Sequence, residues 1–120
     1  MLNLLPYYFK WSNGWYWLYA YVEDFPSEIG YIQWADEFDI TEPGEVAYIW
    51  THENYRRQGV ATRLWIEARR RADNGDCNQP IHSDIRNTAG DLWAQSLGGD
   101  LILRNSKSDL IYPHFEDLGI

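Results

Sequence analysis

The stretch Asn54 to Trp65, NYRRQGVATRLW, decides how the rest of the chain is organised. It follows a run rich in β-branched and aromatic residues, and it leads into a run with a helical period. Its central part, the Arg-Gly loop of residues 56–62, places a glycine and two arginines ahead of a helix whose first amides have no partner inside the helix. Such a loop, at the positive end of a helix dipole, suits a phosphate group.

The run after the loop predicts an amphipathic helix. Val60, Leu64, Ala68 and Ala72 recur every four residues, and arginines occupy the remaining faces. The helix is expected to end near residues 72–73, because the following DNGDCNQ favours a turn.

Four strands are expected before the loop. They cover residues 5–11, 15–22, 29–34 and 45–52. The first two are joined by Asn13-Gly14, a dipeptide that supplies the positive φ of a tight hairpin turn. Pro6 cannot donate to a ladder, so the first strand is expected at an edge or with a bulge there.

The region after the first helix predicts a short strand over residues 80–85, a second helix over residues 87–99 and two short strands within residues 100–115. A strand, a helix and a strand in succession imply a parallel pair. The fold class is therefore α+β, with the order β-β-β-β-α-β-α-β-β, a mixed sheet of about seven strands and two main helices. At 120 residues the whole chain, 1–120, is expected to form one domain.

Charge is segregated along the chain, although its net value is −8. Residues 11–55 contain nine acids and no Lys or Arg, whereas residues 56–71 contain six of the ten basic residues. One part of the protein therefore attracts cations and another attracts anions. The acidic balance argues against nucleic acid as a partner, and the absence of a long apolar run or a cationic leader predicts a cytoplasmic protein without a membrane segment.

The stretch YIWTHENYRRQGVATRLW resembles the signature region of the GCN5-related N-acetyltransferase (GNAT) family. The family loop reads Arg or Gln, two residues, Gly, one residue, then Gly or Ala, and residues 56–61 match it. Further on, HSDIRNTAGDLWAQSLGG resembles the second conserved stretch of the family, with Asn87 and Leu97-Gly98 at the matching places. The resemblance covers about residues 45–99.

The resemblance implies acetyl-CoA as cosubstrate. No metal is expected, since no second ligand stands at helical or strand spacing beside His52 or His114. Free amides and arginines suit the phosphates of coenzyme A. In the family the pantetheine arm pairs with the end of the fourth strand. The residues expected at the cosubstrate are Ile49, Trp50, Thr51, Arg56, Arg57, Gln58, Gly59, Val60, Ala61, Thr62 and Asn87.

The implied reaction is transfer of an acetyl group to a primary amine of a cationic small molecule or protein. Glu45 stands eleven places before Arg56, where the histone acetyltransferase branch has its general base. A plain role for Glu45 at the edge of a strand is the alternative.

Two departures from the family pattern affect the expected chemistry. Position 94 is Ala where many relatives have a Tyr general acid, so protonation of the thiolate would fall to Tyr112, His82, water or nothing.

The turn at residues 12–14 leaves no room for the two helices that form one wall of the acceptor site in relatives. An open acceptor side could admit a protein surface or be closed by a second subunit, as in a homodimer. The same departures support an alternative, a non-catalytic protein that binds a partner through its aromatic and acidic surface.

Overall fold

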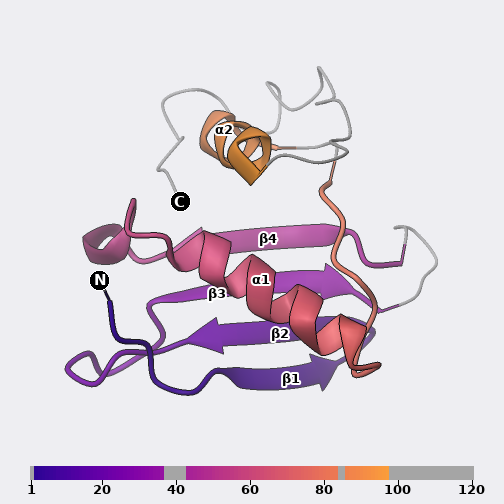
Figure 1. Ribbon diagram of the computed structural model, residues 1–120, viewed down its shortest axis with the longest axis horizontal. Helices are drawn as coiled ribbons and strands as arrows, with labels where there is room; N and C mark the ends of the chain where they lie inside the picture. The colour runs from indigo at the N-terminus through magenta and orange to yellow at the C-terminus, as the bar shows by residue number, and fades with distance from the viewer. Residues whose placement is uncertain (1, 37–42, 84–85, 98–120) are drawn as a thin grey trace.

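The computed structural model describes residues 2–36, 43–83 and 86–97, which form an antiparallel sheet, a helix lying across one face of it and a second helix beside it (Figure 1). The elements are β1 (Tyr8–Ser12), β2 (Trp15–Ala20), β3 (Gly30–Ala35), β4 (Val46–Thr51), a 3-10 turn η1 (Glu53–Tyr55), α1 (Val60–Asp73) and α2 (Thr88–Leu97). The four strands follow one another in the order β1-β2-β3-β4. An α+β fold with two helices is therefore confirmed.

The hairpin of β1 and β2 forms where the sequence predicted it. Asn13 and Gly14 have φ values of 52° and 85°, as a two-residue hairpin turn with positive φ at both central positions requires. Ser12 pairs directly with Trp15 across this turn, so no helix stands between the first two strands. β1 is an edge strand and begins after Pro6.

The expected seven strands are not found: the described residues contain four. In its described part, residues 80–83, the fifth expected strand makes a single parallel bridge, between Ile81 and Glu45. Pro80, before this bridge, has no N–H to donate to a longer ladder. The sheet is therefore antiparallel apart from this bridge, and the last two expected strands, within residues 100–115, lie outside the described residues.

α1 covers the sheet with the apolar stripe that its period predicted. Leu64 and Ala68 are fully buried against Leu18 and Ile32 of the sheet. A Cβ atom on Gly30 would lie 2.9 Å from the Val60 side chain and from the Trp50 carbonyl oxygen, so the glycine lets the start of α1 approach the sheet. This close approach sets the Arg-Gly loop at the end of β4. Neither helix of the described part is long and apolar enough to cross a membrane.

Candidate functional site

The Arg-Gly loop carries two residues in the left-handed region, Arg57 at φ 62° and Gly59 at φ 83°. Gly59 is the N-cap residue of α1 and supplies no side chain to its first amides. A Cβ atom at Gly59 would meet nothing within 4 Å, so the space over the loop is open. The conformation, and not crowding within the protein, is what requires glycine here. The first turn of α1 therefore presents amides at the positive end of the helix dipole to an open space.

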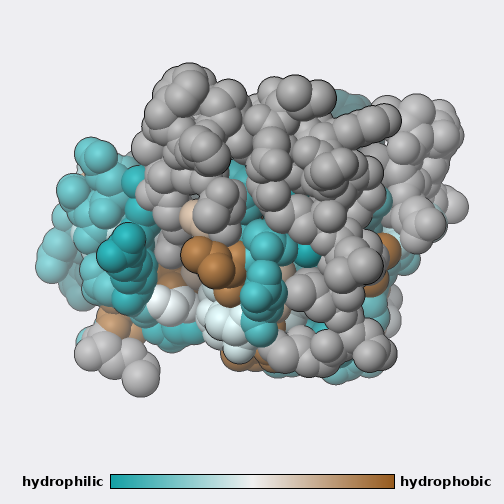
Figure 2. Space-filling view, turned by 90° about the horizontal axis from the view of Figure 1, so that it is seen from above, coloured by the Kyte–Doolittle hydropathy of each residue, from teal (hydrophilic) through white to brown (hydrophobic). Residues whose placement is uncertain are grey.

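The two loop arginines have different roles. The Arg56 side chain donates from Nε to the Thr51 carbonyl oxygen at 3.0 Å, which ties the loop to the end of β4. Arg57, Gln58 and Gly59 are exposed. Figure 2 shows hydrophilic residues gathered at the end of the molecule that carries this loop in Figure 1. Arg57 is thus the accessible cation, and Arg56 also positions the backbone.

Among the described residues no strand pairs with the second half of β4 on the edge that faces away from β3. Pairing with β3 shifts in the first half of β4, since Gln33 pairs with Tyr48 and the next residue, Trp34, pairs with Val46. Beyond this shift the Thr51 carbonyl accepts from Arg56, whereas the next amide, that of residue 52, donates to the carbonyl of residue 29.

Because backbone groups alternate along a strand, those of Ile49 and Thr51 point to the open edge. Trp50, the third residue expected at the arm of the cosubstrate, directs its backbone to β3.

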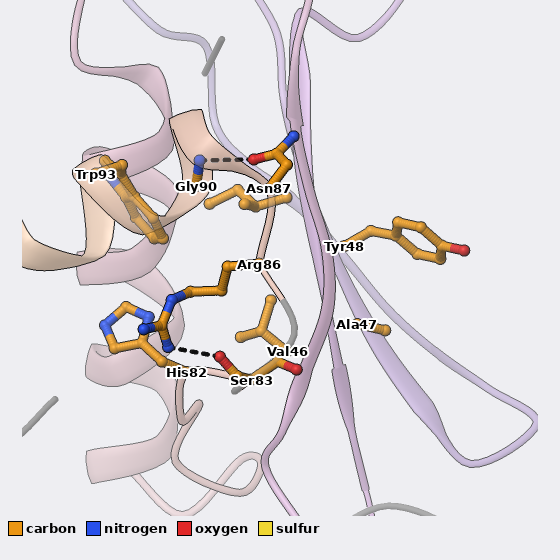
Figure 3. Close-up of a pocket in the computed structure, with 10 residues that line it drawn as sticks. Val46, Ala47, Tyr48, His82, Ser83, Arg86, Asn87, Gly90 and Trp93 are labelled. Atoms are coloured by element: carbon orange, nitrogen blue, oxygen red, sulfur yellow. Dashed lines mark hydrogen bonds between the residues drawn. The ribbon is translucent and has the colours of Figure 1, made fainter. Parts of the chain in front are cut away.

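A cavity of about 130 Å³ lies between this edge, the segment after Ile81 and α2 (Figure 3). It is lined by Val46, Ala47, Tyr48, Ile49, His82, Ser83, Arg86, Asn87, Gly90 and Trp93. In Figure 3 the Tyr48 ring points away from this β4 cavity, to the other side of the sheet, so Tyr48 contributes its backbone. The cavity thus lies along Val46 to Ile49, and the Arg-Gly loop follows the other end of the same strand.

Glu45 lies next to the β4 cavity and not in its lining. Its Oε1 atom accepts a hydrogen bond of 3.4 Å from the Ser83 hydroxyl, and Ser83 lines the cavity. Glu45 is half-buried and forms the parallel bridge with Ile81. The structure thus connects the predicted general base to the cavity through Ser83, a residue that the sequence did not single out.

Arg86 is a second residue that sequence reasoning missed, and it forms part of the wall of the cavity. It is 8% exposed, donates from Nε and Nη2 to Asp91 Oδ1 at 3.0 and 2.8 Å, and donates from Nη1 to the Ser83 carbonyl at 2.7 Å. The sequence offered one signal for this ion pair, namely that Arg86 and Asp91 lie on either side of the start of α2. Asn87, predicted at the cosubstrate, accepts from the Gly90 amide at 2.7 Å, so its side chain caps α2 from the cavity wall.

His82 is held between two indole rings. It stacks on Trp65, with ring centroids 4.2 Å apart and planes 7° apart, and Trp93 meets it edge to face at 5.6 Å. Burial, followed by the charges of Arg86 and Arg69, lowers the pKa of His82 to about 4. The imidazole is therefore neutral at pH 7 and cannot protonate a thiolate as an imidazolium.

The state of His82 predicts how stability depends on pH. Its pKa falls from 6.5 to about 4 on folding, so between these values the unfolded chain binds more protons than the folded chain. The free energy of unfolding should consequently fall as the pH drops through this window. His82→Phe, which keeps a ring against Trp65, should flatten that part of the profile. Urea unfolding of both proteins from neutral pH to about pH 4 measures the difference, and parallel profiles would contradict it.

Position 94 and Cys77 supply no reactive group to the cavity. Ala94 is fully buried and faces the core, so nothing at this position replaces the missing Tyr. Burial raises the pKa of Cys77 to about 11, which disfavours its thiolate. No cluster of three or more His, Cys, Asp or Glu side chains that could hold a metal occurs among the described residues. Tyr112 and His114 lie outside them.

Comparison with known proteins shows the family of this chain. The family model described as acetyltransferase (GNAT) family matches residues 3–98. A search of curated proteins found no match. A similar solved structure is that of AAC(6')-Iy in complex with the bisubstrate analog CoA-S-monomethyl-acetylneamine, with a TM-score of 0.55 and 19% identity over 79% of this chain and 71% of the other. At that identity the likeness shows a common fold. The match over residues 3–98 shows that the chain belongs to the acetyltransferase (GNAT) family.

Proposed function

We propose that this protein is an acetyl-CoA-dependent N-acetyltransferase that acts on a primary amine of a cationic small molecule or protein. One observation carries the proposal. The cavity lies along Val46 to Ile49 of β4, the strand ends at Thr51, and the Arg-Gly loop with the first amides of α1 follows. A ligand with a phosphate end, an amide-bearing arm and a reactive tip matches this sequence of surfaces.

The residues present fit coenzyme A. The open space over Gly59 admits a pyrophosphate close to the amides of residues 58–62, and Arg57 adds an exposed charge for a further phosphate. Ile49 offers backbone groups that the amides of the arm would satisfy, whereas the Thr51 carbonyl already accepts from Arg56. Acetyl-CoA supplies the activated acetyl group as a thioester. The similar structure holds an analog that contains CoA, which supports a CoA site in this fold.

Glu45 and Ser83 are the groups that would take the proton of the amine. An ammonium must lose a proton before its nitrogen can attack, and a carboxylate that reaches the cavity through a hydroxyl can accept it. The acidic stretch of residues 11–55 favours a cationic acceptor. His82 is neutral and Ala94 is buried, so neither provides an acid for the leaving thiolate.

Binding of acetyl-CoA should raise the melting temperature of the protein. A ligand at a hundred times its dissociation constant stabilises a fold by about 2.7 kcal/mol if only the native state binds it. Differential scanning fluorimetry with millimolar acetyl-CoA measures the shift. A short acetyl thioester without the nucleotide is the control, and it should shift the temperature far less because it lacks the phosphates. An unchanged melting temperature with acetyl-CoA would remove the cosubstrate assignment.

A further inference from the structure

The sheet face opposite α1 is a continuous layer of aromatic rings. Its members are Tyr8, Trp17, Tyr19, Tyr31, Tyr48 and Trp50, here called the aromatic face. Tyr19 pairs with Tyr8 on one side and with Tyr31 on the other, and Tyr31 pairs with Trp50. The ring centroids of these three pairs lie 5.8, 6.0 and 5.6 Å apart. The layer therefore extends across all four strands.

The aromatic face is accessible. Tyr8 is 54% exposed and Tyr48 is 57% exposed, while the rings between them are half-buried by one another. The side chains that α1 covers alternate with these along each strand, so the described helix α1 lies on the opposite face. The rings thus form a partly exposed aromatic surface in a protein whose core is formed on the other side.

Two charged side chains stand close to the aromatic face, those of Glu28 and Lys10. Glu28 lies close enough to Tyr19, Tyr21 and Tyr31 for its carboxylate to raise the pKa of their hydroxyls, after the larger effect of burial. Of the described strand residues on this side of the sheet, Lys10 alone is cationic. Four of the six arginines of residues 56–71 belong to α1, on the other side, and the other two lie in the loop after β4. Ring faces carry negative potential, so the rings attract cations, and at the Tyr19 and Tyr31 end of the face the Glu28 carboxylate adds to this attraction.

A buried acceptor lies in the middle of the aromatic face. Gln33 is 7% exposed, pairs with Trp17 and Tyr48, and its Oε1 atom has no hydrogen-bond partner. A buried oxygen without a partner is unfavourable, and an N–H donor that displaces the exposed Tyr48 ring would satisfy it. Lysine and arginine side chains provide both the donor and the positive charge.

We propose that the aromatic face is a docking surface for a lysine- and arginine-rich polypeptide segment. Four strands span about 14 Å, which matches about four residues of an extended chain and exceeds a single small cation. A second copy of this protein fits less well, because it would bring two chains with net charge −8 together. Cation–π contacts and the Glu28 carboxylate recognise the basic side chains.

The aromatic face also leads to the β4 cavity. Tyr48 has its ring on the face and its backbone in the cavity wall, so a docked segment reaches the rim of the cavity across β4 (Figure 3). That a docked lysine is then the acceptor rests on the proposed function. Docking itself does not depend on acetyl transfer, and the two can be measured separately.

The test is the affinity of the full chain, without acetyl-CoA, for a labelled peptide of about twelve residues rich in Lys and Arg. Fluorescence anisotropy should show binding that weakens with salt, and a peptide with Glu in place of the basic residues should not bind. Trp17→Leu combined with Tyr48→Leu should raise the Kd about tenfold. Trp11→Leu is the matched control, because Trp11 is also 57% exposed but lies on the α1 side of the sheet.

Circular dichroism shows whether the double variant folds; if it does not, Tyr48→Leu and Glu28→Gln, each expected to weaken binding, replace it. Absence of binding by the wild type, or equal affinity in wild type and folded variants, would overturn the docking surface. Sedimentation that shows a dimer abolished by the same variants, without peptide binding, would assign the face to self-association instead. A protein that binds the peptide but acetylates neither it nor a small polyamine would refute the proposed function and support the docking surface.

Discussion

Glu45→Gln is expected to lower turnover at neutral pH by about 10²-fold or more, in the range that general bases contribute, while the affinity for acetyl-CoA stays nearly unchanged. The amide keeps the shape of the carboxylate and can still accept from the Ser83 hydroxyl, so the wall beside the cavity is retained. What the variant loses is the capacity to take a proton from the amine. The variant should therefore bind acetyl-CoA as the wild type does and yet transfer the acetyl group much more slowly.

The measurement is a pH profile of thiol release for both proteins with a polyamine and a lysine-rich peptide. The rate of the wild type should rise with pH as the acceptor loses its proton, without a falling limb from a tyrosine acid near its usual pKa of about 10, since position 94 is Ala. Glu53→Gln is the control, because Glu53 is exposed in η1, away from the cavity lining.

A Glu45→Gln protein as fast as wild type would leave an enzyme whose base is another group. A wild type that binds acetyl-CoA and turns over no acceptor would favour the non-catalytic alternative.

Gly59→Glu is expected to abolish acetyl-CoA binding in a protein that still folds. The new side chain would enter the open space over the Arg-Gly loop, and its charge would stand where the pyrophosphate is proposed to lie. The left-handed φ of 83° costs a residue with a side chain about 1–2 kcal/mol, which most domains tolerate. Isothermal titration calorimetry with acetyl-CoA measures the loss.

Gly75 provides a closely matched control at the other end of α1. It also has a φ of 83°, and a Cβ atom there would also meet nothing within 4 Å. Gly75→Glu therefore introduces the same charge and the same backbone strain away from the loop, and it should reduce stability similarly while keeping the affinity. If a folded Gly59→Glu variant retained its affinity, the ligand would have to bind elsewhere.

Local signals in the sequence predicted the elements that local interactions determine. The four-residue period fixed α1 to within a residue at its end, and Asn13-Gly14 fixed the hairpin. The prediction of a strand over residues 80–85 was less successful, because a strand forms only where a neighbouring strand pairs with it. Whether β4 continues to pair with that segment depends on the shifted register of β4 against β3, which no local pattern reports.

The candidate site was predictable in its loop and much less so in its cavity. The Arg-Gly loop has a spacing that can be read from the chain. The surroundings of His82, by contrast, arise from packing of α2 on α1, where the Trp93 indole donates to the Thr62 hydroxyl at 3.1 Å. Ser83 and Arg86 enter the site through the same packing. Contacts between segments that are distant in sequence have no signature in any one of those segments.

The order of the strands has a consequence for folding kinetics. Each strand of the sheet pairs with the strand that follows it in the chain, so the ladders close only short loops, and such topologies form early. The cavity segment joins β4 through one bridge and depends on α2 reaching α1. We therefore expect the sheet with α1 to form first, and the cavity wall to open at a lower free-energy cost than the whole domain, which native-state hydrogen exchange measures.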